Sequence, residues 1–199
     1  MDADAVEIRV LGCLIEKQRA TPDVYPLSLN ALRLACNQST NRDPVVEYDD
    51  LELRAALERL DRKRWTRLTS GPASRAAKYR HLLDEALGLD RAELSLLALL
   101  MLRGPQTPGE LKQRSERLCA FDSTAHVDET LRRLAERELT ERLERRPGQK
   151  EERWAQLLGG GQPAAPAPVA SPLPGSLEER VAALEREVAA LQDALRYRD

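Results

Sequence analysis

A polar stretch in the first quarter of the chain holds side chains that could bind a ligand. Seven successive polar residues run from Asn37 to Asp43. Amide and guanidinium groups donate N–H hydrogen bonds, which are the bonds that phosphate oxygens of a nucleic acid accept. The same side chains could instead cap helix ends and satisfy the backbone of a turn. The candidates for contact with a ligand or phosphate are Asn37, Gln38, Asn41 and Arg42.

A basic stretch follows at residues 51–80, which contain nine basic and three acidic side chains. The whole chain has a formal net charge of -2, so this excess is local. Clustered basic groups attract the phosphates of nucleic acids. Alternatively, the stretch is a solvated face whose arginine stems cover apolar surface. The candidates for phosphate contact are Arg54, Arg59, Arg62, Arg75, Lys78 and Arg80.

Few residues suit catalysis or metal binding. His81 and His126 are the two histidines, and no His/Cys/Asp cluster has metal-ligand spacing. We interpret His81 as a hydrogen-bonded structural residue. Cys13, Cys36 and Cys119 form no Cys-x-x-Cys pair, and the first two fall in apolar helical patterns typical of small core residues. Without a glycine-rich phosphate loop or a nucleophile motif, we expect no enzyme, no cofactor and no metal.

Apolar residues recur at helical spacing in three stretches before residue 65. The first predicted helix covers residues 6–19 and ends before Pro22. Ser28 could cap the second helix. The third begins near Asp49, which fits a capping box with Glu52. The apolar residues assigned to the second and third helices are Leu27, Leu29, Leu32 and Leu34, then Leu53, Leu57 and Leu60.

A basic two-stranded ribbon is predicted behind these helices. Residues 65–69 alternate as a strand does, Gly71-Pro72 breaks the chain, and residues 76–83 resume an extended pattern. A helix-turn-helix with a hairpin behind it is a winged helix. The acids Asp50 and Glu52 lie where a DNA-reading helix meets the major groove, so they count against simple DNA binding.

The same order of elements repeats in the second part of the chain. A strongly apolar helix ends at Gly104-Pro105, Thr107 and then Ser123 or Thr124 could cap two further helices, and Pro147-Gly148 would turn a hairpin. The fold class is therefore mainly α with small β-hairpins (α+β). We predict a winged-helix domain over residues 1–87, a second over 88–158, a linker over 159–175 and a coiled-coil helix over 176–199.

The linker and the last helix differ sharply in composition from the rest. Residues 159–175 contain four glycines, five prolines and no charge, so they cannot form a core. A heptad seam follows, which favours a parallel two-stranded coiled coil and hence a homodimer. The alternative is a helix that folds back on its own chain. The seam residues are Leu177, Val181, Leu184, Val188, Leu191 and Leu195.

Several stretches resemble the bacterial YceH family. They are residues 11–17, 21–32, 35–38, 41–45, 78–81, 103–111 and 146–151. The resemblance covers roughly residues 5–158, leaves the linker and the heptad helix outside, and implies two winged-helix domains. It brings no established activity.

These observations favour a winged-helix DNA-binding or transcription-regulator-like protein without catalytic activity, whose partner would be double-stranded DNA. The alternative is a protein-protein interaction adaptor, because separate acidic and basic faces suit a protein partner equally well. No apolar run approaches the ~20 residues that span a bilayer. The acidic start of the chain does not fit a signal peptide. We therefore expect a cytoplasmic protein without a membrane partner.

Overall fold

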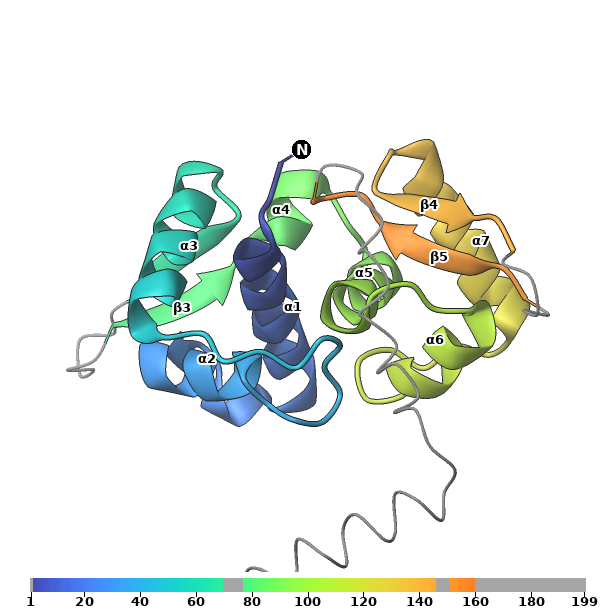
Figure 1. The fold of residues 1–199 in the computed structure, drawn as a ribbon. Helices are drawn as coiled ribbons and strands as arrows, with labels where there is room; N and C mark the ends of the chain where they lie inside the picture. Colours follow the sequence, from blue (N-terminus) through green and yellow to red (C-terminus); the bar gives the residue numbers. More distant parts are fainter. Residues whose placement is uncertain (1, 70–76, 146–150, 160–199) are drawn as a thin grey trace, which may run out of the picture. The chain divides into compact units, whose positions relative to one another are not determined.

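A computed structural model describes residues 2–69, 77–145 and 151–159. Within these ranges the chain is an α+β protein of helices and small antiparallel sheets (Figure 1). None of the helices in the described ranges is long and apolar enough to cross a membrane. Residues 1–164 belong to one compact unit. The predicted linker beyond Gly159, the heptad helix and the two hairpin turns lie outside the described residues.

Three helices of residues 2–87, which we call the first half, begin at side-chain caps. Helix α1 (Ala5–Ala20) begins with a capping box between Asp4 and Glu7. Helix α2 (Leu29–Cys36) begins at Ser28, whose hydroxyl accepts a hydrogen bond from the N–H of Ala31. Helix α3 (Asp50–Arg62) begins with the predicted capping box of Asp49 and Glu52. Each cap satisfies N–H groups that have no partner inside the helix.

A three-stranded antiparallel sheet has the order β1-β3-β2. Strands β2 (Thr66–Thr69) and β3 (Lys78–His81) form the predicted basic ribbon. Leu27 was assigned to a helix, and that prediction is wrong. It lies in β1 (Leu27–Ser28) and pairs with Tyr79, because pairing keeps its backbone bonded while its side chain enters the core. A short helix, α4 (Leu83–Leu87), follows where an extended segment was expected to end.

Residues 88–159, which we call the second half, repeat this order. Helix α5 (Arg91–Arg103) is followed by α6 (Pro108–Ser115) and α7 (Thr124–Glu136), with the predicted caps at Thr107 and Ser123. Strands β4 (Thr140–Leu143) and β5 (Arg153–Gln156) pair antiparallel. Gln106 forms a bridge with Trp154, as Leu27 does with Tyr79 in the first half.

The two halves share a core, in which α1 packs against α5 (Figure 1). Gly12 of α1 permits this approach, because a Cβ atom there would lie 2.9 Å from the side chain of Leu102. Helix α5 is buried from Glu93 to Leu102, which accounts for its apolar character on all sides. The ends of the described chain also meet, since the N–H of Ala3 donates to the carbonyl of Leu158 at 2.9 Å. Folding of residues 1–87 and 88–158 as separate domains stays a prediction.

Candidate functional site

The basic residues of the ribbon gather on one face of the sheet. Arg67 lies directly opposite Arg80 in the ladder between β2 and β3, and Lys78 lies two residues before Arg80. Residues opposite each other, and residues two apart on one strand, point to the same face. We call Arg67, Lys78 and Arg80 the basic wing face. Of the three, only Arg80 has an ion pair among the described residues, at 3.3 Å from the exposed carboxylate of Glu85.

Helix α3 presents two further unpaired cations. Its apolar stripe, which includes Leu57, is buried, so Arg54 and Arg62 point outward and are exposed. No hydrogen bond or ion pair joins either arginine to the described part of the chain. Arg75, the remaining basic candidate of the ribbon, lies outside the described residues.

Arg59 has a different position from its neighbours on α3. Its guanidinium lies 2.5 Å from the carboxylate of Asp4 and 3.7 Å from that of Glu7, both at the start of α1. Lys63 adds a bond of 2.9 Å to Glu7. These pairs attach α3 to α1, so the charge of Arg59 is largely compensated within the protein.

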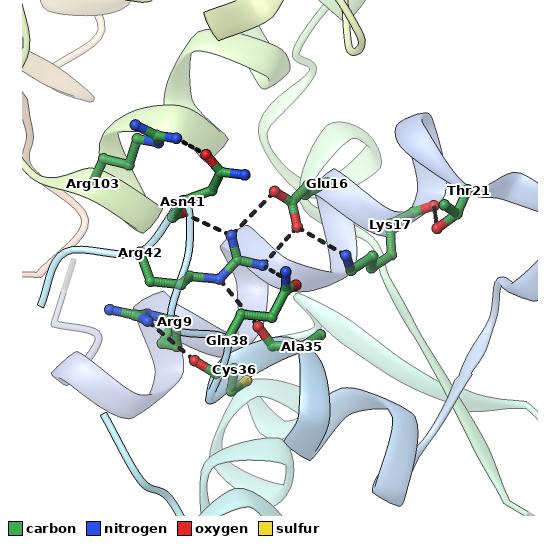
Figure 2. A network of polar contacts seen from close by, with 10 residues as sticks. All are labelled: Arg9, Glu16, Lys17, Thr21, Ala35, Cys36, Gln38, Asn41, Arg42 and Arg103. Atoms are coloured by element: carbon green, nitrogen blue, oxygen red, sulfur yellow. Dashed lines mark hydrogen bonds and ion pairs between the residues drawn. The ribbon is translucent and has the colours of Figure 1, made fainter. Parts of the chain in front are cut away.

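Arg42 is the centre of a buried polar network (Figure 2). Its side chain is 0% exposed, and two of its bonds, of 3.1 and 2.6 Å, reach the carboxylate of Glu16 on α1. Nε donates to the carbonyl of Ala35, and the terminal nitrogens also donate to the carbonyl of Asn41 and to Oε1 of Gln38. An arginine has five N–H donors, so none remains for a phosphate. Burial lowers the pKa of Arg42, but the hydrogen bonds and charge of Glu16, together with Cys13, outweigh this effect and leave the pKa raised.

The other residues of the polar loop also serve the loop itself. The amide of Asn37 donates to the carbonyl of Tyr48 at 2.9 Å and accepts from its N–H at 3.0 Å. Asn41 has a positive φ of 60° and is bonded to Arg103 of α5 (Figure 2). Of the four loop candidates, Asn41 alone is an exposed residue. These contacts fit the alternative that we left open, in which the polar stretch satisfies a turn.

Sequence reasoning missed a polar hollow of about 190 Å³ beside this loop. Asn41, Arg42 and Asp43 of the loop line one side, and residues of α5, α6 and β5 line the other. Besides Arg42, the arginines of this lining are Arg103, Arg114 and Arg153, which come from three different elements and are not brought together by any local pattern.

His81 is buried and hydrogen-bonded within the fold, as expected for a structural residue. It is 1% exposed, and its Nε2 lies 2.8 Å from Oε1 of Gln18. The backbone N–H of His81 donates to the hydroxyl of Tyr25. Burial lowers the pKa of His81 to about 4, although Asp84 at 3.6 Å acts in the opposite direction. The imidazole is therefore neutral at pH 7. Cys13 and Cys36 are buried, as predicted for core residues. The described ranges contain no group of three or more His, Cys, Asp or Glu residues that could hold a metal ion.

Comparison with known proteins gives a consistent result. A family described as "Protein of unknown function, DUF480" matches residues 3–149. A UPF0502 protein of Solibacter usitatus is 48% identical over 193 residues, which cover 96% of this chain and 93% of the relative. A UPF0502 protein of Geobacter metallireducens is 48% identical, and the match covers 93% of this chain and 88% of the relative. A UPF0502 protein of Aeromonas hydrophila is 45% identical, and the match covers 96% of this chain and 91% of the relative. Matches of this extent reach well into the predicted linker and heptad helix, so the tail is not particular to this chain.

Proposed function

The chain belongs to the DUF480 family, and from that premise we propose that it is a non-catalytic protein that binds double-stranded DNA. In this proposal each half is a winged helix, as the resemblance to the YceH family implies. The first half carries the DNA-binding surface, and the heptad helix makes the protein a homodimer.

The observation that carries the proposal is the basic wing face. Arg67 and Arg80 are opposite each other in the ladder, although like charges in this position repel. Glu85 compensates Arg80 in part, and a bound anion would relieve the repulsion that remains. Phosphates spaced along a duplex are anions of the right kind, and the ribbon of a winged helix is a common place for contacts with them.

The acids at the start of α3 are engaged within the protein. Asp49 and Glu52 accept hydrogen bonds from backbone N–H groups of the capping box. Asp50 lies 3.1 Å from Arg33 of α2. Arg54 and Arg62 lie further along α3, so the basic part of this helix lies away from its acidic end.

The second half offers fewer free cations for DNA. Arg132 of α7 is paired with Asp128, and Arg142 and Arg145 of the hairpin are both paired with Glu152. A cation that already has a carboxylate partner gains less from a phosphate. The first half is therefore the better candidate for the DNA surface.

A salt titration of DNA binding by the full chain tests the proposal. The test variant replaces Arg67, Lys78 and Arg80 with Gln. Because each lost phosphate contact reduces the log-log salt slope by about 0.9, the slope should fall by roughly 3 and the affinity should fall as well. The control variant replaces Arg132, Arg142 and Arg145 with Gln, which removes the same charge from the second half. An equal effect in both variants, or no binding of random duplex by the parent at 50 mM salt, would contradict the proposal.

A protein-adaptor function is the second candidate, and exposed apolar residues favour it. Leu34 of α2 is 61% exposed and Leu51 of α3 is 75% exposed. The ion pair between Arg33 and Asp50 joins the same two helices. A protein partner that binds the full chain should lose affinity when Leu34 and Leu51 are replaced by Ser. Leu68→Ser is the control, because Leu68 is similarly exposed at 54% but lies on β2.

A further inference from the structure

We propose that the hollow between the polar loop and α5–α6 is a binding site for a small oxyanion of the phosphate class. This site is separate from the basic wing face and does not depend on DNA binding. Besides Arg42 and Asp43, its polar lining contains Asn41, Arg103, Gln106, Glu110, Arg114 and Arg153.

Arg103 has donors available in this hollow. Its only hydrogen bond in the described part of the chain runs from Nη2 to Oδ1 of Asn41, so Nε and Nη1 are free to bind an anion. Arg114 donates to Oε1 of Gln106 at 2.6 Å. Arg153 donates to the carbonyl of Pro105 at 2.8 Å. These two bonds position both guanidinium groups and leave further N–H donors on each.

The positive charge of the lining is not fully compensated. Glu110 is shared between Arg114 at 3.6 Å and Arg153 at 3.2 Å, and it also accepts the N–H of Thr107 in the capping box of α6. Asp43 lines the hollow but forms no ion pair with these arginines. Arg42 is compensated by Glu16, as described above. Three guanidinium groups therefore face two carboxylates, one of which is already shared.

The pKa of Arg103 is consistent with an excess of positive charge in the lining. Burial lowers its pKa, and the charges of Arg114 and Arg42 lower it further, more than Glu16 and Glu110 raise it. An anion bound beside Arg103 would reverse this repulsion. A guanidinium group can bind two oxygens of one phosphate through its planar fork, which a point charge cannot do.

The size of the hollow limits the ligand. Its volume of about 190 Å³ is below the ~300 Å³ at which sites for drug-sized ligands begin. A phosphate ion or the phosphate group of a small metabolite fits this limit better than a whole nucleotide. Because the lining combines the loop of the first half with α5, α6 and β5 of the second half, a bound anion would stabilise their contact. That contact includes the bond of 2.9 Å from the N–H of Asp43 to the carbonyl of Leu102.

Thermal unfolding of the full chain tests the site, with inorganic phosphate as the ligand and sodium chloride at equal ionic strength as the reference. A ligand at about ten times its Kd should raise the thermal midpoint by about 3 °C, and the rise should saturate. Arg103→Gln should abolish the rise. Arg132→Gln should retain it, because Arg132 is an exposed arginine of α7 that belongs neither to the lining of the hollow nor to the basic wing face. A non-saturating rise, or an equal rise in Arg103→Gln, would overturn the proposal.

A second variant keeps the test informative if Arg103→Gln does not fold. Arg114→Lys retains the charge but loses the planar fork, and equilibrium dialysis with labelled phosphate should show at least a fivefold weaker affinity. An unchanged affinity would overturn the proposal. The same dialysis with glycerol 3-phosphate distinguishes a site for the free phosphate ion from a site for a phosphorylated metabolite. Tighter binding of either ligand supports the site. An equal affinity for succinate would overturn the assignment to phosphate. The salt slope of DNA binding should be the same in Arg114→Lys and the parent, which separates this result from the test of DNA binding.

Discussion

Arg42 illustrates how one residue type can fit two roles that only its surroundings distinguish. An arginine in a polar loop beside a helix-turn-helix is a reasonable phosphate ligand. In the fold, its guanidinium instead bonds to Glu16 of α1, to the last turn of α2 and to its own loop. The residue therefore joins α1 to the end of α2 and to the loop that follows α2.

We expect Arg42→Gln to destabilise the protein by about 3 kcal/mol, because removing one partner of a buried ion pair leaves the other uncompensated. Urea unfolding measures this change. The double variant with Glu16→Gln should lose less than the sum of the two single variants. Arg67→Gln is the control for the loss of an arginine at an exposed position and should change stability by less than 0.5 kcal/mol, a limit typical of surface sites. Additive single effects would show that Arg42 and Glu16 are not coupled.

His81 should make stability depend on pH. Its folded-state pKa of about 4 lies below the ordinary value of 6.5, so between these values the unfolded state binds a proton that the folded state does not. Stability is therefore unaffected above pH 7 and falls as the pH decreases from about 6.5 towards 4. Between pH 7 and pH 5 the loss should be about 2 kcal/mol.

The measurement is urea unfolding of the parent and of His81→Gln at both pH values, since carboxylates also titrate in the acidic range. The variant should lose about 2 kcal/mol less than the parent over this interval. Equal losses in the two proteins would mean that His81 is not buried in its neutral form.

At the scale of elements, the contact between α1 and α5 depends on the absence of a side chain at one position. Gly12 brings the two helices close, whereas glycine in a helix usually costs about 1 kcal/mol relative to alanine. A methyl group at this position would lie 2.9 Å from two carbons of Leu102 and 3.1 Å from Cβ of Met101. Packing and helix propensity therefore act in opposite directions.

Gly12→Ala should destabilise the protein by about 1 kcal/mol, because overpacking of a core costs about 1–3 kcal/mol and the gain in helix propensity offsets only part of it. Gly109→Ala is the control, because the added methyl group would meet nothing closer than 3.9 Å. That change should leave stability unchanged or raise it by up to about 1 kcal/mol. Thermal unfolding of both variants measures the difference, and a stabilised Gly12→Ala would contradict the close packing of α1 and α5.

At the scale of the whole molecule, the heptad seam of residues 176–199 should dimerise the protein. Sedimentation of the full chain should give a dimer at tens of micromolar, and a chain that ends at Ala164 should give a monomer. Ala164 is the right end point, because Asp2 pairs with Gly159 and the compact unit extends to residue 164. If both run as monomers, the heptad prediction is wrong; if both run as dimers, the interface lies within residues 1–164. A dimer joined through the predicted linker and heptad helix would increase DNA affinity by avidity.

Local rules account for the parts of the fold that the sequence by itself determined. The caps at Ser28, Asp49, Thr107 and Ser123 involve residues within three positions of each other, so the bonds are encoded in a short segment. The buried stripes of α3 and α7 are also local, because residues three and four apart lie on the same face of one helix.

Contacts between distant segments were decided only by the tertiary structure. Leu27 forms a strand because Tyr79, on β3, is there to pair with it. Arg42 is paired in the interior because Glu16 of α1, which lies 26 residues earlier in the chain, comes within 3.1 Å of its guanidinium. The hollow around Arg103 combines two halves of the chain, and no local pattern contains that combination. Each of these features forms only when distant segments come together in the core. A cap or a helical stripe, in contrast, is encoded by neighbouring residues of a single element.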